Sequence, residues 1–470
     1  MYKIPIVKYV NLSIWVYFVL LLVVSIIFMD YAMDLQWMFF GAFEILFFLI
    51  GIKVLCQWWW HIRNEKVFER SVFKVALFLR LFYVVFSYFL YIYFTGVPFE
   101  FDAGDATFYH SFGQDIARFG LDKSFDLAKE YEVQISDMGH PIYLGLIYSI
   151  LGDEIIIPRL INAVWGAYTC VLIYRLAKRN FGEIPGRYAA IIAVLFHNFI
   201  YYTGLHLKEI NMLFLTVLFL ERADEALRGE KLSFSSLWMP IVVGLTMFFF
   251  RTVLGAVAFI ALFGSILFSS ERVLSMGKRI LIGFLLFLSS FMLVSDKIVA
   301  EVSAYWEARE KNQSTSMEWR SDREGGNKFA KYGSASLFAP AVFVIPFPTM
   351  VDIDTQMNHQ FRNGGYLEKQ LLAFFVYIAL WMLFVKYKTW RSHLLLLLFM
   401  GGYMAVVCLS AFAMSERFYL PAMPAYVIFV AFGISQMNKT YDKLYLPYLC
   451  LICVAVVAWN WFKLSGRGLI

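Results

Sequence analysis

Two carboxylates stand close together in a polar segment that follows an apolar run. Asp102 and Asp105 lie in the sequence Phe-Asp-Ala-Gly-Asp-Ala-Thr-Phe-Tyr-His at positions 101–110. Carboxylates at this spacing at a membrane edge can share a divalent metal ion, or one of them can act as a general base. Ordinary solvated loop acids are the alternative, and this segment alone leaves both interpretations open.

Three basic residues border or interrupt apolar runs elsewhere in the chain. Lys208 precedes Glu209 in a short turn between two runs, Arg251 stands inside a long apolar stretch, and Arg417 precedes another run. Charged side chains beside lipid are costly unless they are used or paired. Lys208 and Glu209 are equally consistent with ordinary helix ends, but the three cations together indicate a site for an anion.

The elements that must position these residues are membrane spans. Of the 470 residues, 60% are hydrophobic and 16% are charged, against roughly 25% charged residues in soluble domains. Apolar runs long enough to cross a hydrocarbon layer of roughly 30 Å recur along the chain. We therefore expect an all-α, polytopic transmembrane protein. The thirteen expected spans are residues 11–29, 35–58, 72–94, 155–174, 188–203, 210–227, 237–250, 252–268, 280–294, 371–385, 393–413, 419–434 and 444–462.

The basic residues of the short loops orient these spans. With the N-terminus in the cytoplasm, Lys and Arg gather on the cytoplasmic side, in agreement with the positive-inside rule. The opposite side then receives two long loops, 95–154 and 295–370, together with Lys208, Arg251 and Arg417. Each loop contains an apolar stretch too short to span, at 141–151 and 337–350, which predicts juxtamembrane or re-entrant helices.

Charge and cysteine content exclude two further classes of function. The net charge of +6 is scattered through short loops and forms no basic stripe, so no nucleic-acid partner is expected. All five cysteines fall inside apolar runs, so neither a disulfide framework nor a zinc site is expected. The expected partners are membrane lipids and a lipid-borne substrate.

Several stretches, taken in order, resemble the GT-C superfamily of membrane glycosyltransferases, in particular its protein-mannosyltransferase-like and aminoarabinose-transferase-like branch. The likeness covers roughly residues 75–435, and the order of the motifs is what is specific. The stretches are Gly104-Asp105-Ala106 followed by Tyr109, the Gly-His-Pro-Ile-Tyr sequence at 139–143, the segments 151–163 and 174–182, Lys208-Glu209, Arg251, and the run from Glu416-Arg417 to Pro424.

The sequence departs from the superfamily's pattern at three points. Two extra spans precede the catalytic loop, and no large soluble C-terminal domain is expected. The superfamily's Asp-Glu pair is Asp105-Ala106 here, so the second acid is missing, and Asp102 or Glu209 is expected to compensate. The expected organisation is two extra N-terminal helices (1–71), a GT-C-like catalytic module with its catalytic outer loop at 95–154 (72–294), an outer substrate-binding loop (295–370) and C-terminal helices (371–470).

The resemblance implies an inverting glycosyltransferase. It would move a sugar from a polyprenyl-phosphate donor, undecaprenyl phosphate in a bacterial inner membrane, to a glycan, lipid or protein acceptor at the periplasmic face. Asp105, with Asp102, would be the catalytic carboxylate, and cations would hold the phosphate. The phosphate ligands would be Arg251, Arg417 and Lys208, and the substrate pocket would be lined by Tyr109, His110, His140, Arg159 and Glu209.

The resemblance leaves metal dependence open, because some members of the superfamily use a divalent ion and others do not. Mg²⁺ or Mn²⁺ would take its ligands from Asp102, Asp105, His206 and Glu209. Two other functions also stay open: a lipid-linked oligosaccharide polymerase or ligase, and a transporter or flippase. A transporter commonly has paired halves with interrupted helices at matching positions, and we see no internal repeat of that kind.

Overall fold

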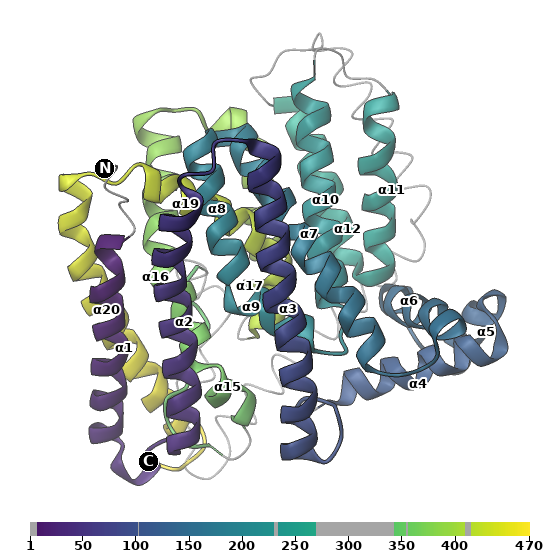
Figure 1. Cartoon of the computed structure of the whole chain (residues 1–470), viewed down its shortest axis with the longest axis horizontal. Helices are drawn as coiled ribbons and strands as arrows, with labels where there is room; N and C mark the ends of the chain where they lie inside the picture. The colour runs from purple at the N-terminus through teal and green to yellow at the C-terminus, as the bar shows by residue number, and fades with distance from the viewer. Residues whose placement is uncertain (1–6, 102, 230–233, 269–342, 354–355, 409–414) are drawn as a thin grey trace.

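The fold is a helical bundle. The computed structural model describes residues 7–101, 103–229, 234–268, 343–353, 356–408 and 415–470. Within these ranges the regular structure is helical, and one isolated β-bridge joins Ala32 to Val351. The long helices run side by side, while α4, α5 and α6 project from one end of the bundle at the lower right of Figure 1. The prediction of an all-α fold is confirmed.

The helices of the first part of the chain include α7, which packs against α3, α8 and α10. They are α1 (Val7–Ile27), η1 (Met29–Tyr31), α2 (Leu35–Trp59), α3 (Glu65–Thr95), α4 (Gly104–Phe119), η2 (Leu121–Lys123), α5 (Ser124–Glu130), α6 (Ile135–Leu151), α7 (Ile156–Phe181), α8 (Glu183–Leu195), α9 (His197–Tyr201), η3 (Tyr202–Gly204), α10 (Glu209–Arg228), α11 (Phe234–Phe250) and α12 (Thr252–Phe268).

The helices of the last part of the chain return into the same bundle, since α16 packs against α2 and α19 packs against α8 and α16. They are α15 (Met357–Phe361), α16 (Asn363–Trp381), η7 (Met382–Lys386), η8 (Trp390–His393), α17 (Leu394–Cys408), α18 (Glu416–Tyr419), η9 (Leu420–Ala422), α19 (Met423–Ser435) and α20 (Lys439–Ser465).

The predicted number of spans is not confirmed by the described residues. Among the residues with a described structure, eight helices are long and apolar enough to cross a membrane, and α11 and α12 are shorter apolar helices. The expected span 280–294 lies outside the described residues, and the expected spans 188–203 and 210–227 are not among the eight. Multiple spans are therefore confirmed, but the count of thirteen is not.

The expected span 188–203 is a broken helix, so the prediction of one continuous span there was wrong. The chain leaves the helical conformation at Phe196, where ψ is 116°, and α9 begins at the next residue. The backbone N–H of His197 then donates to a carboxylate oxygen of Glu368 at 3.0 Å. A break inside the membrane requires such replacement partners for the freed backbone groups.

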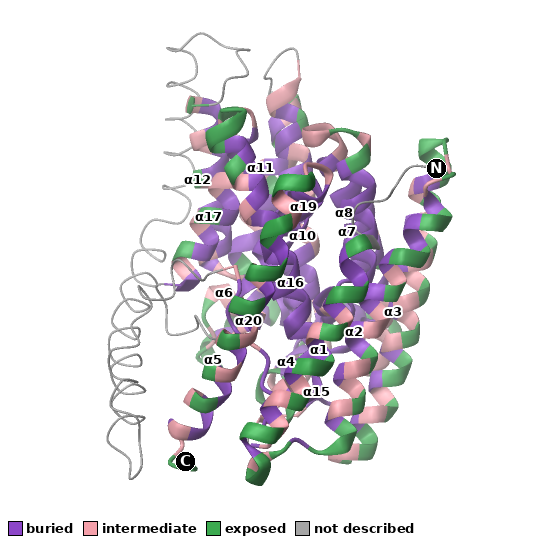
Figure 2. Ribbon diagram, turned by 90° about the vertical axis from the view of Figure 1, so that its left-hand side faces the viewer, coloured by how far each residue is buried: buried purple, intermediate pink, exposed green. Residues whose placement is uncertain are grey.

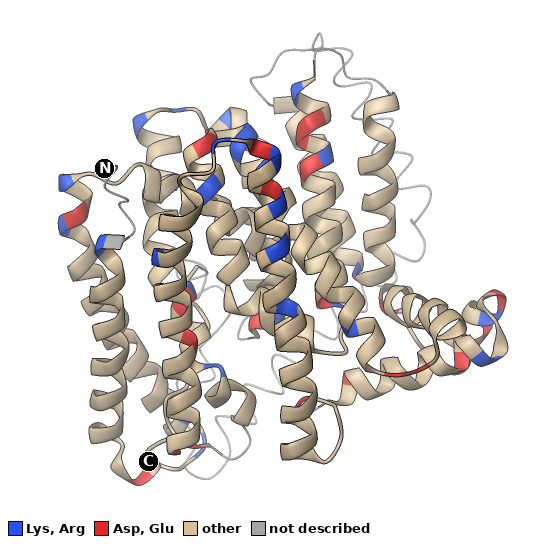
Figure 3. Cartoon of the chain, in the orientation of Figure 1, with Lys and Arg blue, Asp and Glu red and all other residues tan. Residues whose placement is uncertain are grey.

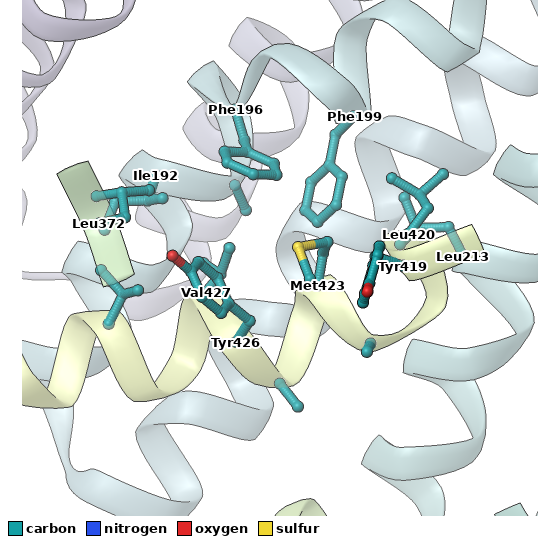
Figure 4. Close-up of a cluster of buried hydrophobic side chains, with 14 of the residues drawn as sticks. Ile192, Phe196, Phe199, Leu213, Leu372, Tyr419, Leu420, Met423, Tyr426 and Val427 are labelled. Carbon is teal, nitrogen blue, oxygen red and sulfur yellow. The ribbon is translucent and has the colours of Figure 1, made fainter. Parts of the chain in front are cut away.

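The core lies along α8, α16 and α19. In the span that contains α19, 89% of the most apolar window is buried, against 28% for the spans of α1, α3 and α20. Figure 2 shows the buried residues concentrated in the central helices. In Figure 4, Phe196 and Phe199 face Met423 of α19. A helix that is apolar on all sides is expected to be surrounded by protein, and α19 occupies that position.

The N-terminal helices are fastened to the start of α16. A Cβ atom added at Gly364 would lie 2.2 Å from the carbonyl oxygen of Gly41 in α2, so only glycine fits this crossing. Tyr17 of α1 donates to Asn363 Oδ1 at 2.7 Å, and Gly365 N donates to Glu44 Oε2 at 2.8 Å. These contacts tie α1 and α2 to the first turn of α16.

The start of α16 also corrects a predicted boundary. The helix begins at Asn363, within the loop expected at 295–370, and not near 371. Glu368, Lys369 and Gln370 are buried there, and each has a hydrogen-bond partner. Because these polar side chains interrupt the apolar pattern, the sequence suggested a loop where the structure has a buried helix.

Residues 343–353 form an irregular segment, here called the strap, that lies against α16 and α20. Gln370 Nε2 donates to the carbonyl oxygens of Val344 and Pro346 at 2.8 and 2.7 Å. Asn460 accepts from Met350 N at 2.8 Å, and Lys463 Nζ donates to Thr349 Oγ1 at 2.8 Å. Side chains from two helices therefore satisfy backbone and hydroxyl groups that no regular structure pairs.

Charged residues gather at the opposite end of the bundle from α4–α6, around the start of α3 and the end of α10 (Figure 3). Arg175 contacts Glu69 through two hydrogen bonds of 2.7 Å. Arg179 contacts Glu221 at 2.7 Å. The basic residues of this end, which the sequence assigned to the cytoplasmic side, thus also join α3, α7 and α10 through ion pairs.

Candidate active site

The segment expected as the first long loop, 95–154, contains the helices α4, α5 and α6. Asp105 is the second residue of α4, and the apolar stretch 141–151 forms the last part of α6. The two helices pack against each other closely, because a Cβ atom at Gly145 would lie 2.4 Å from a side-chain carbon of Ile116. The helix dipole favours a carboxylate in the first turn of a helix, and Asp105 occupies that position in α4.

Arg417 joins two acids that come from distant parts of the chain. Its Nη1 contacts Asp105 Oδ2 at 2.5 Å, across 312 positions of sequence. Its Nε donates to Oε1 of Glu209, the first residue of α10. The side chain of Glu209 is 0% exposed, that of Arg417 21% and that of Asp105 60%. The guanidinium therefore connects a buried carboxylate with one at the open surface.

Arg251 lies beside this bridge without pairing with Asp105. It occupies the junction between α11 and α12, where its Nη1 donates to the Tyr403 hydroxyl at 3.0 Å. Its guanidinium carbon is 4.4 Å from the ring centroid of Phe418, the neighbour of Arg417. It is also within electrostatic reach of Glu209 and Arg417. A second guanidinium thus adds positive charge next to the first.

Lys208 has an acidic partner that the sequence interpretation missed. Its Nζ donates to Oδ1 of Asp137 in α6, which also accepts from the Tyr109 hydroxyl at 3.1 Å. Burial acts to raise the pKa of Asp137, but Lys208, the Tyr109 hydroxyl and Arg251 together hold that pKa below its ordinary value. Lys208 and Tyr109 therefore form one cluster with Asp137. Lys208 directly precedes Glu209 in the chain.

Three predicted or candidate histidines form a cluster of their own. The ring centroid of His206 is 5.5 Å from that of His110 and 6.1 Å from that of His140. The Tyr148 hydroxyl contacts His110 Nδ1 at 2.8 Å and His206 Nε2 at 3.0 Å. Burial lowers the pKa of His140 to about 3 and lowers those of His110 and His206. All three imidazoles are therefore neutral at neutral pH.

Arg159 contributes to the same region from α7. Its Nη2 donates to the Pro98 carbonyl oxygen at 2.6 Å. Glu100, a buried acid that the sequence interpretation did not single out, is within electrostatic reach of Arg159, Arg417 and Glu209. Burial raises the pKa of Glu100. The predicted pocket residue Arg159 therefore supports the start of the outer loop and lies near the charged bridge.

The candidate metal ligands do not come together among the described residues. Asp102 lies outside them. Asp105 and Glu209 both contact Arg417, whereas His206 contacts Tyr148. In the part of the chain that the structure describes, no group of three or more His, Cys, Asp or Glu side chains could hold a metal ion. The three described candidates, Asp105, His206 and Glu209, thus form no shared metal site, and we assign no step to a metal.

The sequence carried weak signals for the residues that it missed. Asp137 precedes the recognised 139–143 stretch by two positions, and Glu100 directly precedes the polar segment 101–110. A single acid beside a motif is easily taken for a solvated residue, because its partner is distant in sequence. Lys208 lies 71 positions from Asp137, which no local pattern reveals.

Comparison with known proteins gives one family match. The model of the family described as dolichyl-phosphate-mannose-protein mannosyltransferase matches residues 138–295. This stretch includes α6 from Met138 onward, the turn with His206 before α10, and Arg251. No curated protein sequence matches the chain.

Two solved structures are similar to parts of the chain. ArnT from Cupriavidus metallidurans bound to undecaprenyl phosphate is 12% identical, with a TM-score of 0.41, over 69% of this chain and 54% of that chain. The Archaeoglobus fulgidus oligosaccharyltransferase in complex with Zn and sulfate is 17% identical, with a TM-score of 0.35, over 70% and 44%. The chain thus spans about half the length of each. The family match over residues 138–295 agrees with the predicted resemblance in that part of the chain.

Proposed function

We propose that the chain transfers a sugar from a polyprenyl-phosphate donor to an acceptor hydroxyl, at the end of the bundle where α4, α6 and the start of α10 meet. The observation that carries this proposal is the contact of Arg417 with both Asp105 and Glu209. It brings the predicted catalytic acid together with a predicted phosphate-binding cation. The name of the matched family, which includes dolichyl phosphate, supports a lipid-phosphate donor.

Asp105 would act as the general base. In this reaction the acceptor oxygen forms a bond to the anomeric carbon while the bond from that carbon to the phosphate oxygen breaks. The acceptor proton passes to the Asp105 carboxylate, and the electron pair of the broken bond leaves with the polyprenyl phosphate. Direct displacement inverts the anomeric carbon. The side chain of Asp105 is 60% exposed, so an acceptor from outside the bundle can reach it.

Arg417 would stabilise the leaving phosphate. Guanidinium groups bind phosphate through charge-assisted hydrogen bonds, and they suit two-point contact better than Lys does. The negative charge on the phosphate increases as the sugar leaves, so a cation fixed beforehand favours the transition state. The neighbouring Arg251 would add to the same field. Lys208, already paired with Asp137, would act on the phosphate only by exchanging that partner.

The neutral imidazoles and Tyr109 would line the sugar side of the site. Neutral His110 and His140 offer both hydrogen-bond donors and acceptors, which suit sugar hydroxyls. They add no charge that would compete with the cations for the phosphate. We further propose an undecaprenyl-phosphate donor in a bacterial inner membrane, with the site at the periplasmic face and an envelope glycan, lipid or protein as acceptor.

The test is donor turnover by the purified protein in liposomes. Undecaprenyl-phosphate-linked hexoses and pentoses are offered as donors together with glycan, lipid and peptide acceptors, and release of undecaprenyl phosphate is followed by mass spectrometry. We expect Asp105→Asn to abolish release while the protein still inserts and folds. Asp126→Asn, which changes an exposed acid of α5, is the matched control and should retain activity.

Two results would overturn the proposal. Full turnover by Asp105→Asn would remove this carboxylate from the mechanism. Movement of the intact donor between leaflets without bond cleavage, in wild-type protein, would favour a flippase instead.

A further inference from the structure

We infer that Arg362, Glu416 and Asn198 form a positioning network that holds Arg417 in place and connects it to the two N-terminal helices. The inference rests on the proposed function, because it assigns these residues to the same site. None of the three is among the residues that contact Asp105. They are therefore positioning residues and not catalytic ones.

The network is a closed ring of buried polar groups. Arg362 Nη2 contacts Glu416 Oε2 at 2.7 Å and also donates to Asn198 Oδ1. Asn198 Nδ2 donates to Glu416 Oε1 at 2.6 Å. All three residues are buried. Both oxygens of the Glu416 carboxylate are thus used, which fixes its orientation as well as its position.

Three tyrosine side chains lie around the guanidinium of Arg362 and help to hold it in the hydrogen-bonded network. Its central carbon lies 3.8 Å from the ring centroid of Tyr201, 5.1 Å from that of Tyr202 and 5.2 Å from that of Tyr366. A desolvated cation gains energy from such ring faces. A planar guanidinium can stack and donate in its plane at once, so Lys at this position would keep the charge but not the geometry.

The network of Arg362, Glu416 and Asn198 connects to the Arg417–Glu209 pair in two ways, through Glu416 and through Asn198. Glu416 directly precedes Arg417 in the short helix α18, so fixing Glu416 also fixes the backbone of Arg417. Asn198 lies in α9, which continues through η3 into the turn that ends at Glu209. One buried network therefore positions both the guanidinium and its buried carboxylate partner.

The same network ends at the N-terminal helices. Arg362 directly precedes α16, whose first residue, Asn363, accepts a hydrogen bond from Tyr17 and whose third, Gly365, donates its N–H to the Glu44 carboxylate. The two extra helices that the superfamily pattern did not explain thus hold the start of α16, and α16 carries Arg362. A buried ion pair is weak evidence for stability alone, but it is well suited to fix one arrangement.

A double-mutant cycle in activity tests the inference. A displacement of about 1 Å in a catalytic group can cost about 100-fold in rate, so we expect Glu416→Gln to lower kcat/KM by about 10- to 100-fold. In an Arg417→Lys background the same change should cost less than about threefold, because the group it positions is already altered. Arg362→Lys should retain more activity than Arg362→Gln.

The matched control is Glu221→Gln. Glu221 is also a buried acid paired with an arginine, Arg179, but at the opposite end of the bundle. It should leave kcat/KM unchanged in both backgrounds. If Glu416→Gln costs the same in both backgrounds, or nothing in the wild type, the inference is overturned.

A second measurement is independent of sugar transfer. In a background with Cys450 and Cys453 replaced by Ser, cysteines placed at 105 and 417 are joined by a short bis-maleimide, and the two variants that carry only one of the added cysteines are the controls. Arg362→Gln should slow this reaction, and Arg179→Gln should not. An unchanged rate in Arg362→Gln would refute the positioning role, whereas a wild type inactive with every donor refutes only the proposed function.

Discussion

Replacing Arg417 removes a cation shared by two carboxylates of very different exposure. Leaving a buried charge without its partner costs about 3–5 kcal/mol, whereas an exposed ion pair contributes about 0–1 kcal/mol. The side chain of Glu209 is 0% exposed and that of Asp105 is 60% exposed. We therefore expect Arg417→Ala to lower the free energy of unfolding by about 3 kcal/mol. This value is at the lower end of that range because Arg417 itself is partly exposed.

The substitution Asp105→Asn removes the other end of the same bridge. It leaves Glu209 paired with Arg417, so we expect a loss of less than about 1 kcal/mol. Both variants should nevertheless lack sugar transfer, since one loses the base and the other the phosphate ligand. Activity and stability should therefore separate at Asp105 and fall together at Arg417.

Equilibrium unfolding in mixed micelles, followed by circular dichroism over a titration of denaturing detergent, measures both values. Reversibility is checked by dilution, and Asp126→Asn gives the value for an exposed acid of the same outer segment. Equal destabilisation by Asp105→Asn and Arg417→Ala would refute the reasoning, because it would mean that burial of Glu209 does not decide the energy of the bridge.

Three further predictions concern two residues of the candidate site, Asp137 and His140, and the helix crossing at Gly364. Because the folded-state pKa of Asp137 lies below the ordinary 3.8, its pairing with Lys208 should stabilise the fold fully above that pH and be lost as the pH falls further. Unfolding of Asp137→Asn against pH should lack this loss. His140, with a pKa of about 3 against 6.5, should make the protein progressively less stable from pH 6.5 downward, and His140→Gln should flatten that slope. Gly364→Ala, which brings a Cβ atom within 2.2 Å of a carbonyl of α2, should cost about 1–3 kcal/mol, whereas Gly401→Ala, with no atom within 4 Å, should be neutral or slightly stabilising in thermal unfolding.

The helical membrane fold could be predicted because apolar length is a strong signal. The ends of the predicted spans were less certain where buried polar residues interrupt the apolar pattern. Glu368, Lys369 and Gln370 suggested a loop, because sequence does not reveal that their partners lie on other helices and in the strap. The break at Phe196 was missed for the same reason, since the carboxylate that satisfies the break lies 171 positions away.

At the candidate site, the sequence was a better guide to which residues belong to the site than to which of them pair with each other. Asp105, Glu209 and Arg417 were selected as charges at the outer ends of spans, and they are in contact. Lys208 was assigned to a phosphate, yet it is paired with Asp137. A local pattern shows that a charge needs a partner, but only the packing of helices decides which partner it has.

The strap has a consequence for the order of assembly in the cell. Its residues 348–350 are held by Asn460 and Lys463 of α20, more than a hundred positions later in the chain. The ribosome makes these partners more than a hundred residues after the strap, so residues 348–350 cannot adopt this arrangement until α20 has been made and packed. Packing of the strap is therefore coupled to insertion of α20, and a chain that stops before Asn460 would leave residues 348–350 without these hydrogen bonds.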